Sequence, residues 1–245
     1  MRHSRQVVLV VAVLALNVAG TIAFPLAALA HEGVPSAEAL DARVWELRAR
    51  RQYGDALAIA RQLLVLRESD DATMAFELGD ARRLVEVLEH ITALPEAARK
   101  ELAEADSIVA VDRALWEEGR YSAAAAAVRR QLKIRRKWLG ETHHDVGLSL
   151  NDLAADLSAA GEHAAAEPLY REALQILRMR VGDEHPFVAG ALNNLAELLT
   201  KRGDYAEAEP LYRRALATSK ALLGEEHPDV RIDLRSALHA LARHA

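Results

Sequence analysis

The sequence predicts an all-α protein that folds as a right-handed solenoid of antiparallel helix pairs. The main observation is a 42-residue period, in which the segment 139–146 recurs at 181–188 and again at 223–230. Within each period, apolar residues recur at the spacing of one helix face. The 245 residues also include only 12 Gly, 7 Pro, 3 Trp, 5 Tyr and 3 Phe. Strand-rich sandwiches and barrels use more turn and aromatic residues than this.

Composition separates the chain from several functional classes. With 51% hydrophobic and 27% charged residues, it has enough apolar material for a core and enough charge for a solvated surface, which excludes a disordered chain. The absence of Cys excludes disulfides, thiolate zinc sites and cysteine nucleophiles. A formal net charge of −5 argues against a nucleic-acid partner, because nucleic-acid binders normally show a basic excess.

Residues 1–30 are predicted to be a signal peptide. Arg2 and Arg5 precede an apolar run that closes on small residues at Ala28 and Ala30, the pattern of a signal-peptidase site. We therefore expect cleavage near Ala30 and an exported chain, either periplasmic or secreted. The alternative is an uncleaved segment that anchors the N-terminus in a membrane, because the run is long enough to span a bilayer. Membrane association is expected only in that case.

Residues 31–103 are predicted to form a divergent helical region. Tyr53 lies 68 residues before Tyr121, which is the length of two 34-residue units. Residues 72–106 occupy the place of a second helical pair, divided near Pro95. Whether they form a true repeat is left open by the sequence.

Residues 104–229 are predicted to form three helix pairs, with unit boundaries at 104–145, 146–187 and 188–229. The first helices of the second and third units share an apolar stripe at i, i+3, i+4 and i+7: Leu150, Leu153, Ala154 and Leu157, and Leu192, Leu195, Ala196 and Leu199. Gly161 and Gly203 follow these helices and suit the left-handed residue that closes a helix. Residues 230–245 repeat only a first helix, with polar residues at the other positions, as expected of a C-terminal capping helix.

The repeated segments resemble tetratricopeptide repeats of the kinesin-light-chain type. The resemblance lies in Leu192-Asn193-Asn194-Leu195-Ala196, in the stretch from Gly203 to Tyr212, and in the stretch from Leu223 to Val230. It is close over 146–230 and extends back to about 104. It implies a superhelix whose concave groove binds a protein or peptide partner, with Asn side chains bonding the backbone of an extended peptide.

Polar residues beside the apolar stripe are the candidate groove residues. They are Arg113, Asn151, Asp152, Asn193, Asn194, Glu197, Arg235 and His239. An amide side chain offers two donors and an acceptor, so it can hydrogen-bond the backbone of a peptide whatever the peptide's side chains are. Asn is a mediocre helix former, so its recurrence in mid-helix favours a binding role over ordinary solvated positions, which are the alternative. Asn151 and Asn193 fit the family pattern, whereas Arg235 departs from it.

The sequence contains no motif that predicts catalysis, a cofactor or a metal. A glycine-rich phosphate loop, a serine elbow and an HExxH pair are all absent. Histidines recur in equivalent loops, and because these loops lie one repeat apart, histidines of different loops are expected to be too far apart to share an ion. They are His143 and His144 in the first loop, His185 in the second and His227 in the third. We therefore expect a non-enzymatic, exported scaffold that binds a peptide segment of a partner protein. The alternatives are a self-assembling structural solenoid, which makes a homo-oligomer, or a non-catalytic accessory arm of an envelope enzyme system.

Overall fold

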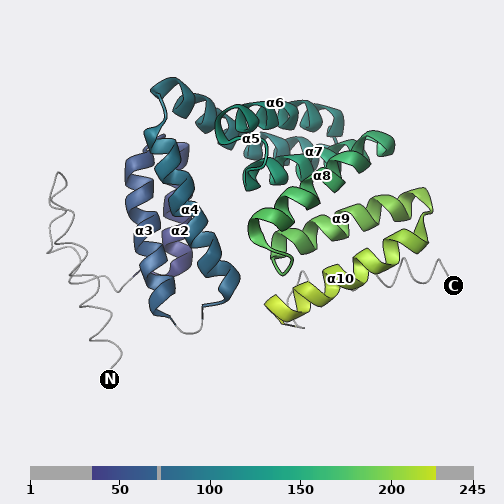
Figure 1. The fold of residues 1–245 in the computed structure, drawn as a ribbon. Helices are drawn as coiled ribbons and strands as arrows, with labels where there is room; N and C mark the ends of the chain where they lie inside the picture. Colours follow the sequence, from purple (N-terminus) through teal and green to yellow (C-terminus); the bar gives the residue numbers. More distant parts are fainter. Residues whose placement is uncertain (1–34, 71–72, 225–245) are drawn as a thin grey trace, which may run out of the picture.

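The computed structural model describes residues 35–70 and 73–224, and every regular element in that part of the chain is an α-helix (Figure 1). The helices are α2 (Ala37–Ala49), α3 (Tyr53–Ser69), α4 (Ala75–Ala93), α5 (Glu96–Glu117), α6 (Tyr121–Leu139), α7 (His144–Ala159), α8 (His163–Val181), α9 (Pro186–Arg202) and α10 (Tyr205–Leu223). Among these described helices, none is both long and apolar enough to cross a membrane. The predicted signal peptide (1–30) and capping helix (230–245) lie outside the described residues.

Helices α5 to α10 form three consecutive antiparallel pairs, α5–α6, α7–α8 and α9–α10 (Figure 1). Each pair packs on the next, α6 against α7 and α8 against α9. Glycines with positive φ occur every 21 residues from Gly119 onwards and end successive helices. Gly161 and Gly203, with φ of +86° and +89°, close α7 and α9 in the left-handed region that a Cβ disfavours. The predicted all-α solenoid of helix pairs is confirmed.

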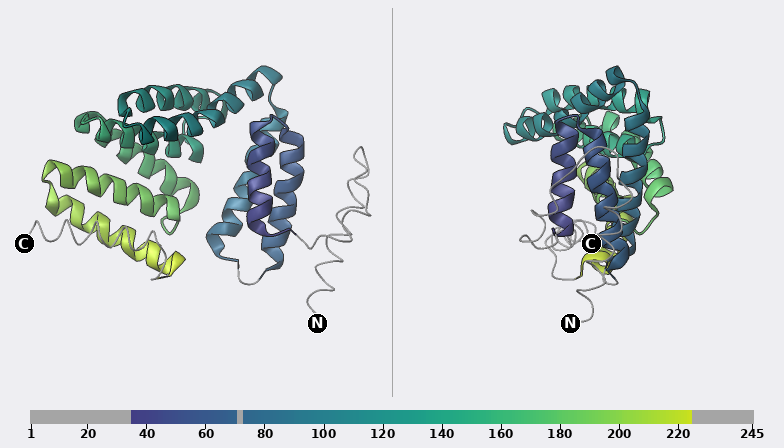
Figure 2. Two further views of the ribbon diagram at one scale, coloured as in Figure 1. Left: turned by 180° about the vertical axis from the view of Figure 1, so that it is seen from behind. Right: turned by 90° about the vertical axis from the view of Figure 1, so that its left-hand side faces the viewer.

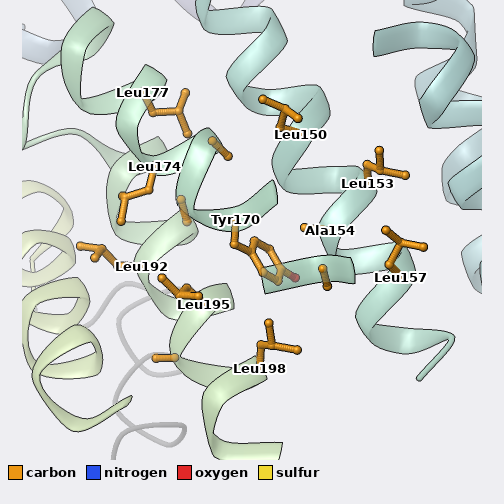
Figure 3. Packing of buried hydrophobic residues seen from close by; sticks show 14 of the residues in the cluster. Leu150, Leu153, Ala154, Leu157, Tyr170, Leu174, Leu177, Leu192, Leu195 and Leu198 are labelled. Atoms are coloured by element: carbon orange, nitrogen blue, oxygen red, sulfur yellow. The ribbon is translucent and has the colours of Figure 1, made fainter. Parts of the chain in front are cut away.

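A continuous hydrophobic core runs through these pairs. The predicted stripe of α7 is at most 4% exposed and that of α9 at most 3%, which confirms the assignment of their buried faces. Tyr170 of α8 lies among the leucines of α7 and α9 (Figure 3). Because one hairpin cannot cover its own apolar stripe, each pair completes the core of its neighbour.

Helices α2, α3 and α4 form a bundle beside the three pairs (Figures 1 and 2). Over 72–106, α4 packs mainly on α3 and α5 mainly on α6, so these two helices do not form the expected pair with each other. Pro95 separates α4 from α5, and α5 begins at Glu96, before the expected unit boundary at 104. The first turns of α5 instead complete a second core with the bundle, which includes Val44, Tyr53, Leu88 and Leu102.

Two polar contacts hold the bundle against the helix pairs. His185, the N-cap of α9, is 1% exposed, and its Nε2 lies 3.2 Å from both carboxylate oxygens of Asp80 in α4. The Nδ1 of this ring accepts the Phe187 N–H, so the ring proton is on Nε2 and is donated to Asp80. Near the start of the pairs, the buried Arg48 of α2 donates to Asp106 of α5 at 2.9 Å.

Candidate functional site

Six of the predicted groove residues lie on the first helices of the pairs. They are Arg113 on α5, Asn151 and Asp152 on α7, and Asn193, Asn194 and Glu197 on α9. We call the surface formed by these six residues the first-helix face. The other two predicted residues, Arg235 and His239, lie outside the residues that the structure describes.

The asparagines of neighbouring units are in direct contact on this face. Asn194 Nδ2 donates to Asn151 Oδ1 at 3.1 Å, which links α9 to α7. Both side chains are half-buried, and the Asn151 side chain is in turn hydrogen-bonded to Asp152. The structure therefore joins three of the predicted residues into one polar row that crosses two helix pairs.

The other predicted residues are not in that row. Glu197 is exposed and pairs with Lys201 one turn further along α9, at 2.9 Å. Arg113 is exposed and forms no ion pair in the described part of the chain. Asn193 differs from both, because its Oδ1 is buried and has no hydrogen-bond partner among the described residues. A buried acceptor without a donor is uncommon in folded proteins and therefore points to a missing partner.

The predicted groove residue Asp152 belongs to an acidic cluster that the sequence analysis did not predict. Asp112 of α5 lies beside Asp152 and Asp156 of α7, and Asp156 is fully buried. Burial raises the pKa of Asp152 to about 6 and that of Asp156 to about 7, and the negative charge of Asp112 adds to both shifts. Trp116 Nε1 donates to Asp156 Oδ1. The repeat contained a signal for this burial. Leu198, the equivalent residue 42 positions later in the next unit, is buried, so Asp156 is expected to be buried as well.

Within the described residues, one group of three side chains could hold a metal ion. The ligand atoms of His143, His144 and Asp145 all lie within 4.8 Å of one another. Each already has a local role: His143 Nδ1 accepts the Asp145 N–H at 3.2 Å and caps α7, and His144 Nε2 lies 3.1 Å from Asp145 Oδ1. Burial lowers the pKa of His143 to about 4, so this ring is neutral at pH 7 and can serve as the cap acceptor.

Both the sequence and the structure of the chain are similar to those of known proteins. Residues 113–179 and 188–229 each match a family model described as tetratricopeptide repeat. The chain is similar in structure to BtubC (BKLC) from P. vanneervenii, with 21% identity, coverage of 86% of this chain and 85% of that chain, and a TM-score of 0.55. It is also similar to nearly identical TPR-like repeats of a putative kinesin light chain from Podosopora anserina, with 16% identity, coverage of 84% and 86%, and a TM-score of 0.45. No curated protein matches the sequence.

Proposed function

Because the chain is a tetratricopeptide repeat protein, we propose that it is exported and that its first-helix face binds a peptide segment of a partner protein. Repeats of this family generally mediate protein–protein interaction or scaffolding and are typically non-catalytic. The N-terminal pattern of basic residues, apolar run and small-residue end supports export.

The observation that supports a peptide on this face is the buried Asn193 Oδ1, which has no hydrogen-bond partner among the described residues. A buried acceptor gains a hydrogen bond when a backbone N–H reaches it, which offsets the cost of its desolvation. The neighbouring row of Asn194, Asn151 and Asp152 extends the polar surface towards α7. An extended peptide along this row meets donors and acceptors from two successive helix pairs.

A crosslinking pull-down from cells that produce the full chain tests this function. The wild type is compared with an Asn151→Ala/Asn193→Ala variant and with a matched Arg129→Ala/Lys133→Ala control, whose two side chains are exposed on α6. We expect a partner that the wild type and the control capture and that the asparagine variant loses. A partner retained equally by all three proteins would contradict recognition by the first-helix face. Mass determination of the chain's N-terminus in the same cells tests cleavage near Ala30.

A further inference from the structure

The acidic cluster between α5 and α7 lacks an ion-pair partner in the described part of the chain. Asp112, Asp152 and Asp156 form no ion pair with any Arg, Lys or His of the described residues. One oxygen of Asp156, Oδ2, is buried without a hydrogen-bond partner there, and so is Asp112 Oδ1. The two side chains approach closely enough to hydrogen-bond each other when one of them is protonated.

The other buried carboxylates in residues 35–70 and 73–224 are paired, which makes this cluster an exception. Asp106 accepts from Arg48 at 2.9 Å and lies 3.4 Å from Arg135, and the buried Asp145 is paired with His144. Pairing of this kind is the usual condition for keeping a carboxylate out of water. Asp156 is fully buried and has no basic partner among the described residues, so it is held near neutrality by a raised pKa instead of by an ion pair.

The groups around the cluster suit a long cationic side chain. From α5, Trp116 is 40% exposed and Val109 is 43% exposed, and they present apolar surface next to the acids. From α8, Tyr170 lies near Asp152 and Asp156 and adds no positive charge; it also lies near Glu197 of α9, which pairs with Lys201. Among the described residues, two cations lie in the neighbourhood. Arg113 of α5 is exposed, and the charge of Arg135 of α6 lowers the pKa of Asp152 without forming an ion pair with it.

We propose that the bound peptide segment carries a lysine or arginine whose charged end docks against Asp112 and Asp152, above the buried Asp156. This inference rests on the proposed peptide-binding function and adds the chemical class of the partner. The methylene stem of such a side chain can lie on the exposed Trp116 ring while its head group replaces the missing countercharge. The cluster directly adjoins the asparagine row, because Asp152 belongs to both.

The pH dependence of binding follows from the same groups. Burial holds the pKa of Asp152 at about 6 and that of Asp156 at about 7, so these two carboxyls are largely protonated at pH 5 and ionised at pH 8. A cation binds the ionised form. The affinity for a basic peptide is therefore expected to weaken by about tenfold or more between pH 8 and pH 5.

Selection from a phage-displayed library of random dodecapeptides on the chain at pH 8 tests the inference. We expect the selected peptides to be enriched in Lys or Arg. Binding of a selected peptide should weaken at least about tenfold with Asp112→Asn/Asp152→Asn, a loss typical of a desolvated charge pair. The control Glu117→Gln/Glu162→Gln removes the same charge from exposed positions and should change the affinity less than twofold. Because the aspartate substitutions relieve like-charge repulsion, that variant should melt no lower than wild type.

The outcomes separate the two proposals. Peptides that need Asn151 and Asn193 but show no basic enrichment, or that bind the double Asp variant as tightly as wild type, would overturn the cationic partner and leave peptide binding in place. If no peptide is selected, both proposals fail. Equal affinity at pH 5 and pH 8 also contradicts docking on the acidic cluster.

Discussion

Replacing Asp156 with asparagine should stabilise the protein at high pH, although the residue is fully buried. Asparagine keeps the shape of the side chain, its oxygen can still accept from Trp116, and its NH₂ group can donate to Asp112. The substitution therefore removes a carboxylate that folding desolvates, without opening a cavity. The main effect of Asp156→Asn is therefore to remove the unfavourable ionisation of this side chain in the folded state.

The size of the effect follows from the pKa. Burial raises the pKa of Asp156 to about 7, whereas an unfolded aspartate titrates near 3.9. Between those values the folded state holds a proton that the unfolded state has lost, so stability falls as the pH rises and levels off above pH 7. The difference between the folded and unfolded pKa values corresponds to about 4 kcal/mol in the free energy of unfolding. Since part of it is shared with Asp112 and Asp152, we expect Asp156→Asn to gain about 2–4 kcal/mol at pH 8.

Thermal melting of both proteins at pH 5 and pH 8 measures this gain. At pH 8 the variant should melt roughly 5–15 °C above wild type, and at pH 5, where Asp156 is protonated, the two should nearly coincide. Comparing the two proteins at each pH cancels the opposite trend from His143, whose lowered pKa makes stability rise with pH between about 4 and 6.5. Glu117→Gln is the control for loss of an exposed charge and should shift stability by less than about 0.5 kcal/mol. An equal melting temperature for variant and wild type at pH 8 would refute the reasoning.

Three further predictions concern packing, the bundle and assembly. Ala196→Asp places an unpaired charge at a fully buried position and should cost about 3–5 kcal/mol in a denaturant titration, whereas Asn193→Ala should change the unfolding midpoint little; similar losses would show that α9 faces the other way. Asp80→Ala removes the acceptor of His185 and should speed amide exchange in α4 while exchange in the core of α7 stays slow; unchanged exchange in α4 would mean that this contact does not hold the bundle in place. Light scattering after size exclusion should give the mass of one chain without an added partner, and a larger mass would favour the self-assembling solenoid.

The repeat-containing helices were predictable because their signals are periodic. The stripes of α7 and α9 and the glycines that close them recur at 42 residues, and the structure buries the stripes as predicted. The helices before α5 lack this period, so neither the packing of α4 on α3 nor the contact of Asp80 in α4 with His185, 105 residues away, could be predicted from spacing. A local sequence pattern also cannot show which distant segments contact each other, because those contacts depend on how whole helices pack.

The candidate site was predictable to a similar extent. The contact between Asn151 and Asn194 follows from equivalent helices lying side by side, and both residues were candidates from the sequence. The acidic cluster was not predicted because solvated carboxylates are common on helices and the sequence alone does not show burial. Comparing units position by position would have identified it, since Asp112 and Asp156 occupy places where later units have Ala154 and Leu198.

Site-specific photocrosslinking tests recognition by the first-helix face most directly. A photoreactive amino acid is introduced at Glu197, which is exposed on α9, and separately at Lys133, which is exposed on α6. Irradiation of cells that produce each variant should join one partner protein to position 197 and leave position 133 without that product. A product at position 133 and none at 197 would contradict binding at the first-helix face.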